Sequence, residues 1–417
     1  MWTRRLFLKS SGFALLSFGF GPSFLVRAAQ GANAWSRKRV LVALFQRGAM
    51  DGLAAVPPVD SPDLVRLRPR LALGAVRASG ENRLLDLGVG FGFHPALAPL
   101  LPLFQQRQLA VVHCVGSPDP TRSHFDAQDY METGTPGRKG TTSGWLNRVC
   151  GELGHEASPL RALSLTAALP RSLYGPQATV AVARLEDLAL RNPLVGSTGM
   201  ATAQRRGFEA LYEQTASELL RRGASEAFEA ARLLQAVTRE NRASRGRYPV
   251  SPLGEALRQI AAVIRADVGL EVAFAESGGW DTHVRQGAAD GTFARRAEDL
   301  AQAVAAFWED LGARQEDVVL LTMTEFGRTV AENGSGGTDH GHGSRLFVLG
   351  SRVDGGKVHG KFPGLDRDLL YEGRDLPVTT DFRAVFSEVA VAHLGVDPKA
   401  ELFPGWTGGR LPLFRSA

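Results

Sequence analysis

Cysteine is scarce in this chain. Only Cys114 and Cys150 occur among its 417 residues, and no Cys-x-x-Cys pair is present. A zinc site built from thiolates is therefore disfavoured, because such sites draw on closely spaced cysteine pairs. The two cysteines would be able to pair in an oxidising compartment, and the sequence leaves open whether they do.

The chain also lacks a long uninterrupted hydrophobic run. In residues 1–34 the apolar stretch is broken by glycines and Pro22, well short of the roughly 20 residues that a membrane-spanning helix needs. Arg4-Arg5 followed by Phe-Leu-Lys resembles a twin-arginine export signal, which the export machinery reads as an address. An uncleaved membrane helix is the alternative. We expect residues 1–34 to be a cleaved signal, with a periplasmic or secreted mature protein and no permanent membrane anchor.

A strong basic field is missing as well. The formal net charge is +5, and removal of residues 1–34 takes away four basic residues and no acid, which leaves 5 − 4 = +1. No patch of interleaved basic and aromatic residues stands out. Proteins that bind nucleic acid through the phosphate backbone need such a field, so we expect no nucleic-acid partner.

What the chain does contain is an alternation of short apolar runs with segments of helical spacing. The predicted strands are 39–45, 109–116, 271–277, 318–327 and 345–350, and the predicted helices lie within 94–108, 203–244, 252–266 and 292–314. This alternation predicts an α/β fold in one domain, residues 35–417, with a mostly parallel sheet and helices on both faces. The charged stretch at about 180–250 is predicted to be a helical insertion or cap.

Polar side chains follow the predicted strands where each one ends. In α/β sheets, ligands bind at the carboxyl ends of the strands. The residues in these positions are Asp51, Ser123, His124, Asp281, His283 and Glu325. Each has an ordinary structural alternative: a turn residue for Asp51, a helix N-cap for Ser123, packing beneath its helix for His124, a loop hydrogen bond between Asp281 and His283, and an ion pair of Glu325 with Arg328. His94, before a Pro-led helix, is interpreted as structural.

The segment GTDHGHGS, residues 337–344, brings Asp339, His340 and His342 into four positions. It is too rich in glycine to be a helix. Carboxylate and neutral imidazole are ligands that zinc and similar ions prefer. The pattern therefore indicates a metal site completed by segments elsewhere in the sequence.

Several of these motifs together resemble a known family. TDHGHG is similar to the Asp-His-Gly loop of the alkaline phosphatase, phosphoglycerate mutase and sulfatase superfamily, and SHFDAQDYMETG is similar to its nucleophile helix. The whole set resembles a large family of twin-arginine-exported bacterial proteins of unknown function that is assigned to that superfamily. The resemblance implies a three-layer α/β/α sandwich with a mostly parallel central sheet. The motifs are RRxFLK, QRGAMDGL, RSHFDAQDYMETG, GWLNR, GGWDTH, TEFGRT and GTDHGHG.

The resemblance also implies roles for individual residues, and Ser123 matches the nucleophile. Arg122 has no counterpart in the superfamily by position, but its place beside Ser123 suits the binding of an oxyanion. His124 is a candidate donor to the substrate because it is adjacent to Ser123 in the sequence. The implied metal ligands are Asp51, Asp281, His283, Asp339 and His340, with Glu325 as a ligand or an orienting residue, His342 as a further ligand and His359 in reserve. The superfamily's usual Asp-x-x-x-His spacing is shortened here to Asp-x-His. These residues imply two divalent metal ions, zinc first, with manganese, calcium or magnesium as alternatives.

The sequence therefore leads to a functional hypothesis. It predicts an exported metal-dependent hydrolase that acts on a small anionic substrate, a phosphate or sulfate ester, with a serine nucleophile and a two-metal site. The alternative is a binding or surface-assembly protein that retains the fold and part of the metal site without turnover.

Overall fold

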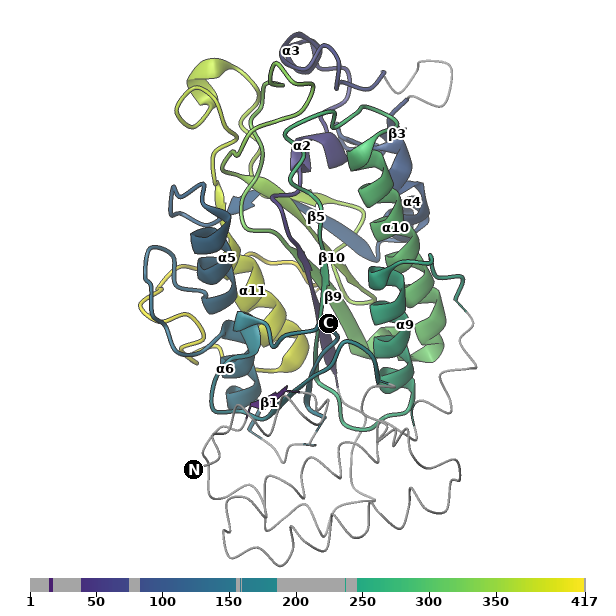
Figure 1. Ribbon diagram of the computed structural model, residues 1–417, viewed down its shortest axis with the longest axis vertical. Coiled ribbons are helices and arrows are strands. Elements are labelled where there is room, and N and C mark those ends of the chain that lie inside the picture. Colours follow the sequence, from purple (N-terminus) through teal and green to yellow (C-terminus); the bar gives the residue numbers. More distant parts are fainter. Residues whose placement is uncertain are drawn as a thin grey trace, which may run out of the picture.

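The computed structural model describes residues 15–17, 39–74, 83–154, 158, 160–185, 237 and 246–415. Its centre is a ten-stranded sheet in the order β1-β7-β6-β8-β2-β9-β10-β5-β11, and β12 also pairs with β5 (Figure 1). The strands are β1 (Leu15–Ser17), β2 (Val40–Gln46), β5 (Leu109–Gly116), β6 (Ala162–Ser164), β7 (Thr179–Ala181), β8 (Val272–Ser277), β9 (Val318–Met323), β10 (Ser344–Gly350), β11 (Val358–His359) and β12 (Thr380–Asp381). Six neighbouring pairs are parallel, and only β1/β7, β9/β10 and β10/β5 are antiparallel.

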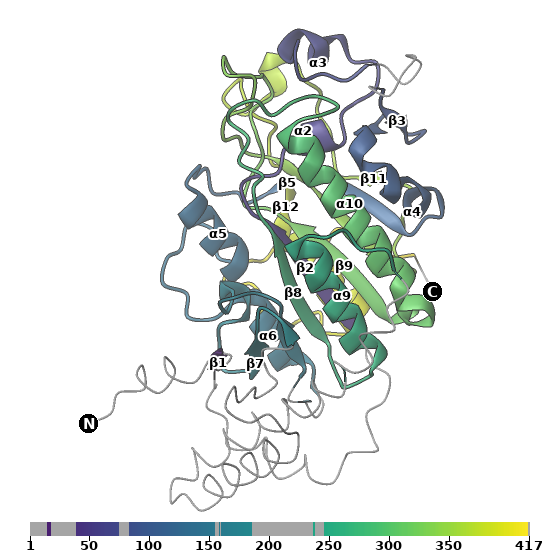
Figure 2. The same ribbon diagram turned by 45° about the vertical axis from the view of Figure 1, so that its right-hand side comes forward.

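Helices cover both faces of this sheet. On one face lie α9 (Pro252–Arg265) and α10 (Thr292–Leu311), and on the other lie α6 (Trp145–Glu152) and α11 (Phe382–Val389) (Figures 1 and 2). Further elements are the helices α2 (Gly52–Ala55), α3 (Pro62–Leu67), α4 (Leu101–Gln105) and α5 (His124–Thr133), a small hairpin of β3 (Leu85–Asp86) and β4 (Gly92–Phe93), and several short 3₁₀ and π helices. The chain has the mixed α/β fold, with a large mostly parallel sheet, that the sequence predicts.

Side chains that alternate along β2 explain why both faces are covered. Val42 and Leu44 join the core beneath α9 and α10, whereas Leu41 and Phe45 point into the core beneath α6 and α11. Because neither face is polar, β2 reads as a continuous apolar run.

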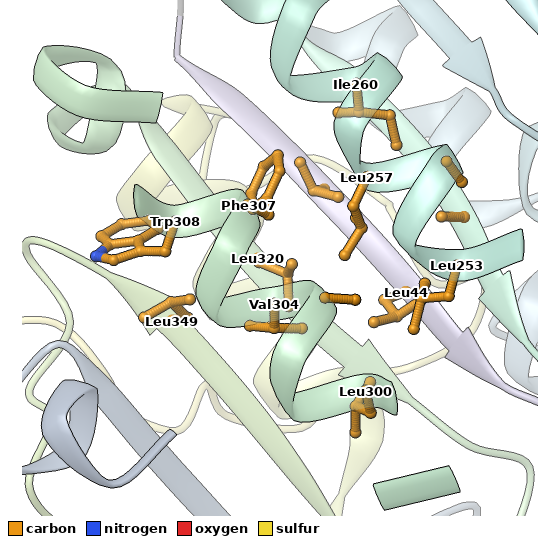
Figure 3. Close-up of a cluster of buried hydrophobic side chains, with 14 of the residues drawn as sticks. Leu44, Leu253, Leu257, Ile260, Leu300, Val304, Phe307, Trp308, Leu320 and Leu349 are labelled. Carbon is orange, nitrogen blue, oxygen red and sulfur yellow. The ribbon is translucent and has the colours of Figure 1, made fainter. Parts of the chain in front are cut away.

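The helix α10 is built around an apolar stripe at helical spacing. Leu300, Val304 and Phe307 follow one another at intervals of three or four residues and face Leu44 of β2 and Leu320 of β9 (Figure 3). This packing fixes the strands whose ends carry the polar residues.

The boundaries of most predicted elements in the described residues agree with the structure to within a few residues, although β9 ends at Met323, four residues before the predicted end. A larger difference occurs at one helix. The predicted helix over 94–108 is instead a 3₁₀ helix at Pro95–Leu100 followed by the short α4. Pro99 and Pro102 lack the backbone N–H that a continuous α-helix needs, so the segment changes geometry between them.

Much of two predicted segments lies outside the described residues. Of residues 1–34 only β1 is described, and it pairs with β7 at the sheet edge. Of the predicted insertion at about 180–250, residues 180–185, 237 and 246–250 are described. Among the described helices, none combines the length and hydropathy that a bilayer crossing requires. Cys114 and Cys150 are buried free thiols.

Candidate metal centre

The carboxyl ends of four strands meet at one edge of the sheet. β2, β8 and β9 are parallel, and β5 runs in the same direction because β10 is antiparallel to both β9 and β5. The segments that leave these four strands therefore start at the same edge. Since β10 runs the other way, the glycine-rich segment that precedes it arrives at this edge too.

Four side chains from these segments come together there. His124, Asp281 and His340 could hold a metal ion, because one ligand atom of each lies within 4.8 Å of the others. His340 Nε2 is 3.0 Å from His124 Nε2 and 3.4 Å from Asp281 Oδ1. His283 Nε2 lies 2.9 Å from His340 Nε2 and 3.0 Å from Asp281 Oδ1. We refer to His124, Asp281, His283 and His340 as the metal cluster.

The other ring nitrogen of each histidine faces an oxygen atom. A carbonyl or carboxylate oxygen accepts hydrogen bonds, so Nδ1 of each ring carries the proton and donates it. In the neutral ring, Nε2 then presents a lone pair. The acceptors are the Arg122 carbonyl for His340 at 2.8 Å, Glu325 Oε1 for His124 at 2.8 Å and Asp339 Oδ1 for His283 at 2.9 Å. Three lone pairs and a carboxylate therefore face one another, an arrangement that a proton or a cation between them would stabilise.

The spacing and charge of the cluster fit a divalent ion. Nitrogen ligands about 2.0–2.1 Å from a tetrahedral zinc lie about 3.3 Å from one another, and the separations of neighbouring ligand atoms here run from 2.9 Å to 3.5 Å. Three carboxylates, Asp281, Glu325 and Asp339, and the guanidinium of Arg328 give a formal charge of −3 + 1 = −2 when the imidazoles are neutral. A second guanidinium, that of Arg374, donates to the His340 carbonyl and is itself paired with Asp375.

Asp281 is held in place by Arg328. The Arg328 side chain is buried, and its Nη1 donates to Asp281 Oδ1 at 2.6 Å. Burial is the largest influence on Asp281 and raises its pKa, but Arg328, His283 and His124 together outweigh it and hold the pKa below its usual value. The carboxylate is therefore ionised at neutral pH and available as a ligand.

Glu325 lies behind His124 and is fully buried. Its Oε1 accepts from His124 Nδ1, from Gln128 Nε2 at 2.9 Å and from the Gly48 N–H at 2.9 Å. The hydrogen bond that His124 donates to Glu325 raises the pKa of His124 and outweighs burial. Glu325 thus pairs with His124, and the ion pair with Arg328 that the sequence left as an alternative does not form. Glu325 is therefore placed to orient His124 as a metal ligand.

Asp339 plays a similar part behind His283. Its Oδ1 accepts from His283 Nδ1 and from Asn333 Nδ2 at 3.0 Å. Hydrogen bonds from Asn333 and His283 hold the pKa of Asp339 below its usual value. The sequence predicts that Asp339 is a metal ligand, whereas in the structure Asp339 contacts the cluster only through Nδ1 of His283.

Asp51 is placed elsewhere, in a buried ion pair with Arg68. Arg68 Nη1 donates to Asp51 Oδ2 at 2.8 Å, Gln286 Nε2 donates to the same oxygen at 2.7 Å, and the Ala54 N–H donates to Oδ1 at 3.0 Å. Asp51 also caps α2. Both oxygens are occupied by donors of the chain, so the structure does not bring Asp51 to the metal cluster.

Three histidines that the sequence singles out lie apart from the cluster. His342 is buried and stacks on Tyr371, with ring centroids 4.5 Å apart. His359 Nε2 faces the Asp354 carbonyl at 2.9 Å. His94 is buried at the start of the 3₁₀ helix, where Nδ1 accepts from the Ala96 N–H, so the prediction that His94 is structural is confirmed.

Ser123 lies between two residues that contact the cluster. The carbonyl of Arg122 accepts from His340, and His124 belongs to the cluster. Ser123 is the N-cap residue of α5, but its hydroxyl makes no capping hydrogen bond. The structural alternative is therefore met in position, because Ser123 is the N-cap residue, but not in the capping hydrogen bond of its side chain. Arg122 is bound by Glu372 at 2.6 Å and Asp375 at 2.7 Å.

Sequence reasoning missed the residues that support the ligands. Gln128, which fixes Glu325, follows His124 by four residues on α5, a spacing that places both on one helix face. Asn333 and the pairing of Arg328 with Asp281 left no comparable signal, because these contacts join separate loops.

Comparison with known families gives one match. Residues 83–402 match the family described as "Protein of unknown function (DUF1501)". The match covers most of the chain and includes all four residues of the metal cluster, so the chain belongs to this family. None of the curated proteins compared with the chain matches it.

Proposed function

We propose that this protein is an exported metal-dependent hydrolase of phosphate or sulfate esters, built on an alkaline-phosphatase-like α/β/α sandwich. The observation that carries the proposal is the convergence of three Nε2 lone pairs and the Asp281 carboxylate, with each outer nitrogen tied to an oxygen. Carboxylate–histidine contacts of this kind orient metal ligands.

Ser123 supplies the nucleophile in this proposal. It precedes the ten-residue α5, whose first-turn N–H groups and dipole favour an anion. The Ser123 oxygen would attack phosphorus or sulfur, the alcohol of the ester would leave, and water would then release the acid from the serine. A bound divalent cation supplies charge neutralisation and lowers the pKa of a nearby hydroxyl. Glu325 and Asp339 keep His124 and His283 oriented throughout.

For the number of ions, we propose fewer than the two that the sequence-based hypothesis implies. Two ions would need a second set of ligands, but among the described residues one group of this kind occurs, and Asp51 is committed to Arg68. We therefore propose one tightly bound ion, with zinc first because of the three imidazoles.

Metal content tests this part directly. Elemental mass spectrometry of the purified protein should find about one equivalent of divalent metal. The variant His340→Ala should lose this metal. His359→Ala is the matched control, because His359 lies outside the cluster and should leave the content unchanged. Wild-type protein that is folded but binds no divalent metal would contradict the proposal.

Turnover tests the chemistry. Aryl phosphates, phosphodiesters and aryl sulfates should include a class that wild type hydrolyses and Ser123→Ala does not, while Ser123→Ala keeps its metal. Ser251→Ala is the matched control, since it also removes an N-cap serine, that of α9.

A metal-binding protein without turnover is the second candidate. The observation that favours it is the single cation group, which is smaller than the two-ion site that the superfamily resemblance implies. Full metal content with no Ser123-dependent hydrolysis of any ester class would select this function.

Export by the twin-arginine route belongs to the same proposal. It is supported by Arg4-Arg5 and the interrupted apolar stretch that follows. Replacement of both arginines by lysine should leave the protein in the cytoplasmic fraction, and unchanged export would contradict the route.

A further inference from the structure

Arg345 is a fully buried arginine on β10 with incomplete hydrogen bonding. Its Nη1 donates to the Gly52 carbonyl at 2.7 Å, whereas Nε and Nη2 have no hydrogen-bond partner. A buried donor without a partner destabilises the folded state, and more so when it is charged. Burial lowers the pKa of Arg345 to about 10, so the side chain remains charged at neutral pH.

His113 of β5 lies directly opposite Arg345 in the antiparallel pair. It is 2% exposed, and its Nδ1 also lacks a partner. Phe91 and Phe362 border both residues. The guanidinium carbon is 5.6 Å and 5.7 Å from their ring centroids, and the His113 ring centroid is 4.5 Å and 5.5 Å from them. Three nitrogen atoms without partners thus belong to two cross-strand neighbours beside the same two rings, which contact each other edge to face at 5.4 Å.

The described residues provide no counter-ion for Arg345. The electrostatic partners that favour its charge are Cys114 and Asp51. Burial raises the pKa of Cys114 to about 11, so that thiol is neutral, and Asp51 is already paired with Arg68. The two phenylalanine rings attract the cation but offer no strong acceptor for its N–H groups.

We propose that Arg345 and His113 bind a small inorganic anion of the halide class, with chloride as the physiological candidate. A halide accepts hydrogen bonds from Nε and Nη2 of Arg345 and from Nδ1 of His113. Its negative charge also neutralises the buried guanidinium. A water molecule would satisfy donors but leave the charge in place. A phosphate or sulfate has four oxygens to satisfy, more than these three nitrogen atoms and two aromatic rings can serve. This site is independent of the metal cluster and of the proposed hydrolysis.

Bromide replacement locates the anion without any variant. Crystals of the full chain soaked in sodium bromide should give an anomalous peak within about 3.5 Å of Arg345 Nε or Nη2, a normal halide-to-nitrogen range slightly beyond that of oxygen acceptors. Ordered density there without anomalous signal would be water and would overturn the proposal, as would empty space.

Thermal unfolding gives a second measurement in solution. At constant ionic strength, replacing gluconate by chloride should raise the unfolding midpoint of wild type by about 1–3 °C per tenfold increase in chloride, because the anion binds the folded state. Arg345→Met should lose this dependence. Arg70→Met, which removes an exposed arginine, is the matched control and should keep it. A wild-type midpoint that does not respond to chloride contradicts the proposal, and if Arg345→Met fails to fold, the bromide peak decides.

Discussion

Glu325 controls the direction in which His124 presents its lone pair. Glu325→Gln removes the negative charge behind His124 and allows the amide to turn its N–H toward Nδ1. We expect metal affinity to fall about 10- to 100-fold, the usual effect of losing an orienting partner, with the fold retained. Competition titration with a chelating indicator measures it. Glu255→Gln removes a glutamate paired with Arg258 on α9 and serves as control. Equal affinities of Glu325→Gln and wild type would mean that Glu325 does not orient a ligand.

Asp51 and Arg68 allow a structural role to be separated from metal binding. Both side chains are almost completely buried and paired at 2.8 Å. Arg68→Met leaves the carboxylate of Asp51 buried without its cation, which should lower the free energy of unfolding by about 3–5 kcal/mol. Urea unfolding measures this loss.

The metal content of Arg68→Met should nevertheless equal that of wild type under native conditions, because the pair does not contact the cluster. Loss of metal from the folded variant would instead support the sequence-based assignment of Asp51 as a ligand. The control is Arg66→Met, which breaks an exposed pair with Asp63 and should change stability by less than about 1 kcal/mol.

The glycine-rich segment before β10 is close to another backbone, and this explains its composition. Residues 327–329 run antiparallel to 339–342: the Thr329 N–H donates to the Asp339 carbonyl and the Gly341 N–H donates to the Gly327 carbonyl. A Cβ atom on Gly341 would lie 2.4 Å from the carbonyl carbon of Arg328. Glycine is therefore required by the close approach of two chains.

Gly341→Ala should consequently displace His340 from the cluster. The added methyl group meets backbone, which cannot rotate away, so we expect a loss of about 1–3 kcal/mol in stability together with a drop in metal affinity. Gly334→Ala is the matched control, because a Cβ at that position in the same loop region meets nothing within 4 Å. The two variants are compared by urea unfolding and metal titration. Similar behaviour of both would contradict the close-packing explanation.

Elements and ligands differ in how far the sequence determines them. The strand β5 begins and ends where its apolar run does, since burial on both faces leaves a continuous signal. His340 and His342 are both histidines and lie two positions apart in the sequence, but only His340 reaches the metal cluster. The chain bends at His342, whose ring stacks on Tyr371. The residue types in segment 337–344 predict a metal site. Which of the two histidines is the ligand depends on the bend, and the bend depends on contacts with the distant loop that contains Tyr371.

The order of the strands in the sheet could not be predicted from the sequence, for a similar reason. β10 follows β9 along the chain and lies beside it, but antiparallel, and it separates β9 from β5. Alternating elements predict a mostly parallel sheet, whereas the direction of one strand depends on pairing between residues far apart. This reversal brings the start of β10 to the edge where the other strands end, and so brings His340 to Asp281.

His393 couples the stability of the whole molecule to pH. The ring is 2% exposed, and its Nε2 donates to the Val40 carbonyl at 3.0 Å, which ties the segment after α11 to β2. Burial lowers the pKa of His393 to about 4, whereas in the unfolded chain it is about 6.5. Between these values the unfolded state binds the proton and the folded state does not. The free energy of unfolding therefore falls as the pH falls from about 6.5 to about 4.

The variant His393→Gln isolates this contribution, because glutamine keeps an N–H for Val40 but does not titrate. Urea unfolding at pH 7 and pH 4.5 should show that wild type loses about 2–3 kcal/mol more than His393→Gln over this interval, at about 1.4 kcal/mol for each pH unit below 6.5. The control His359→Gln changes a partly buried histidine on β11 and should follow the wild-type profile. Parallel profiles for wild type and His393→Gln would mean that protonation of His393 is not what couples folding to pH, because the ring would then take up its proton equally well in both states.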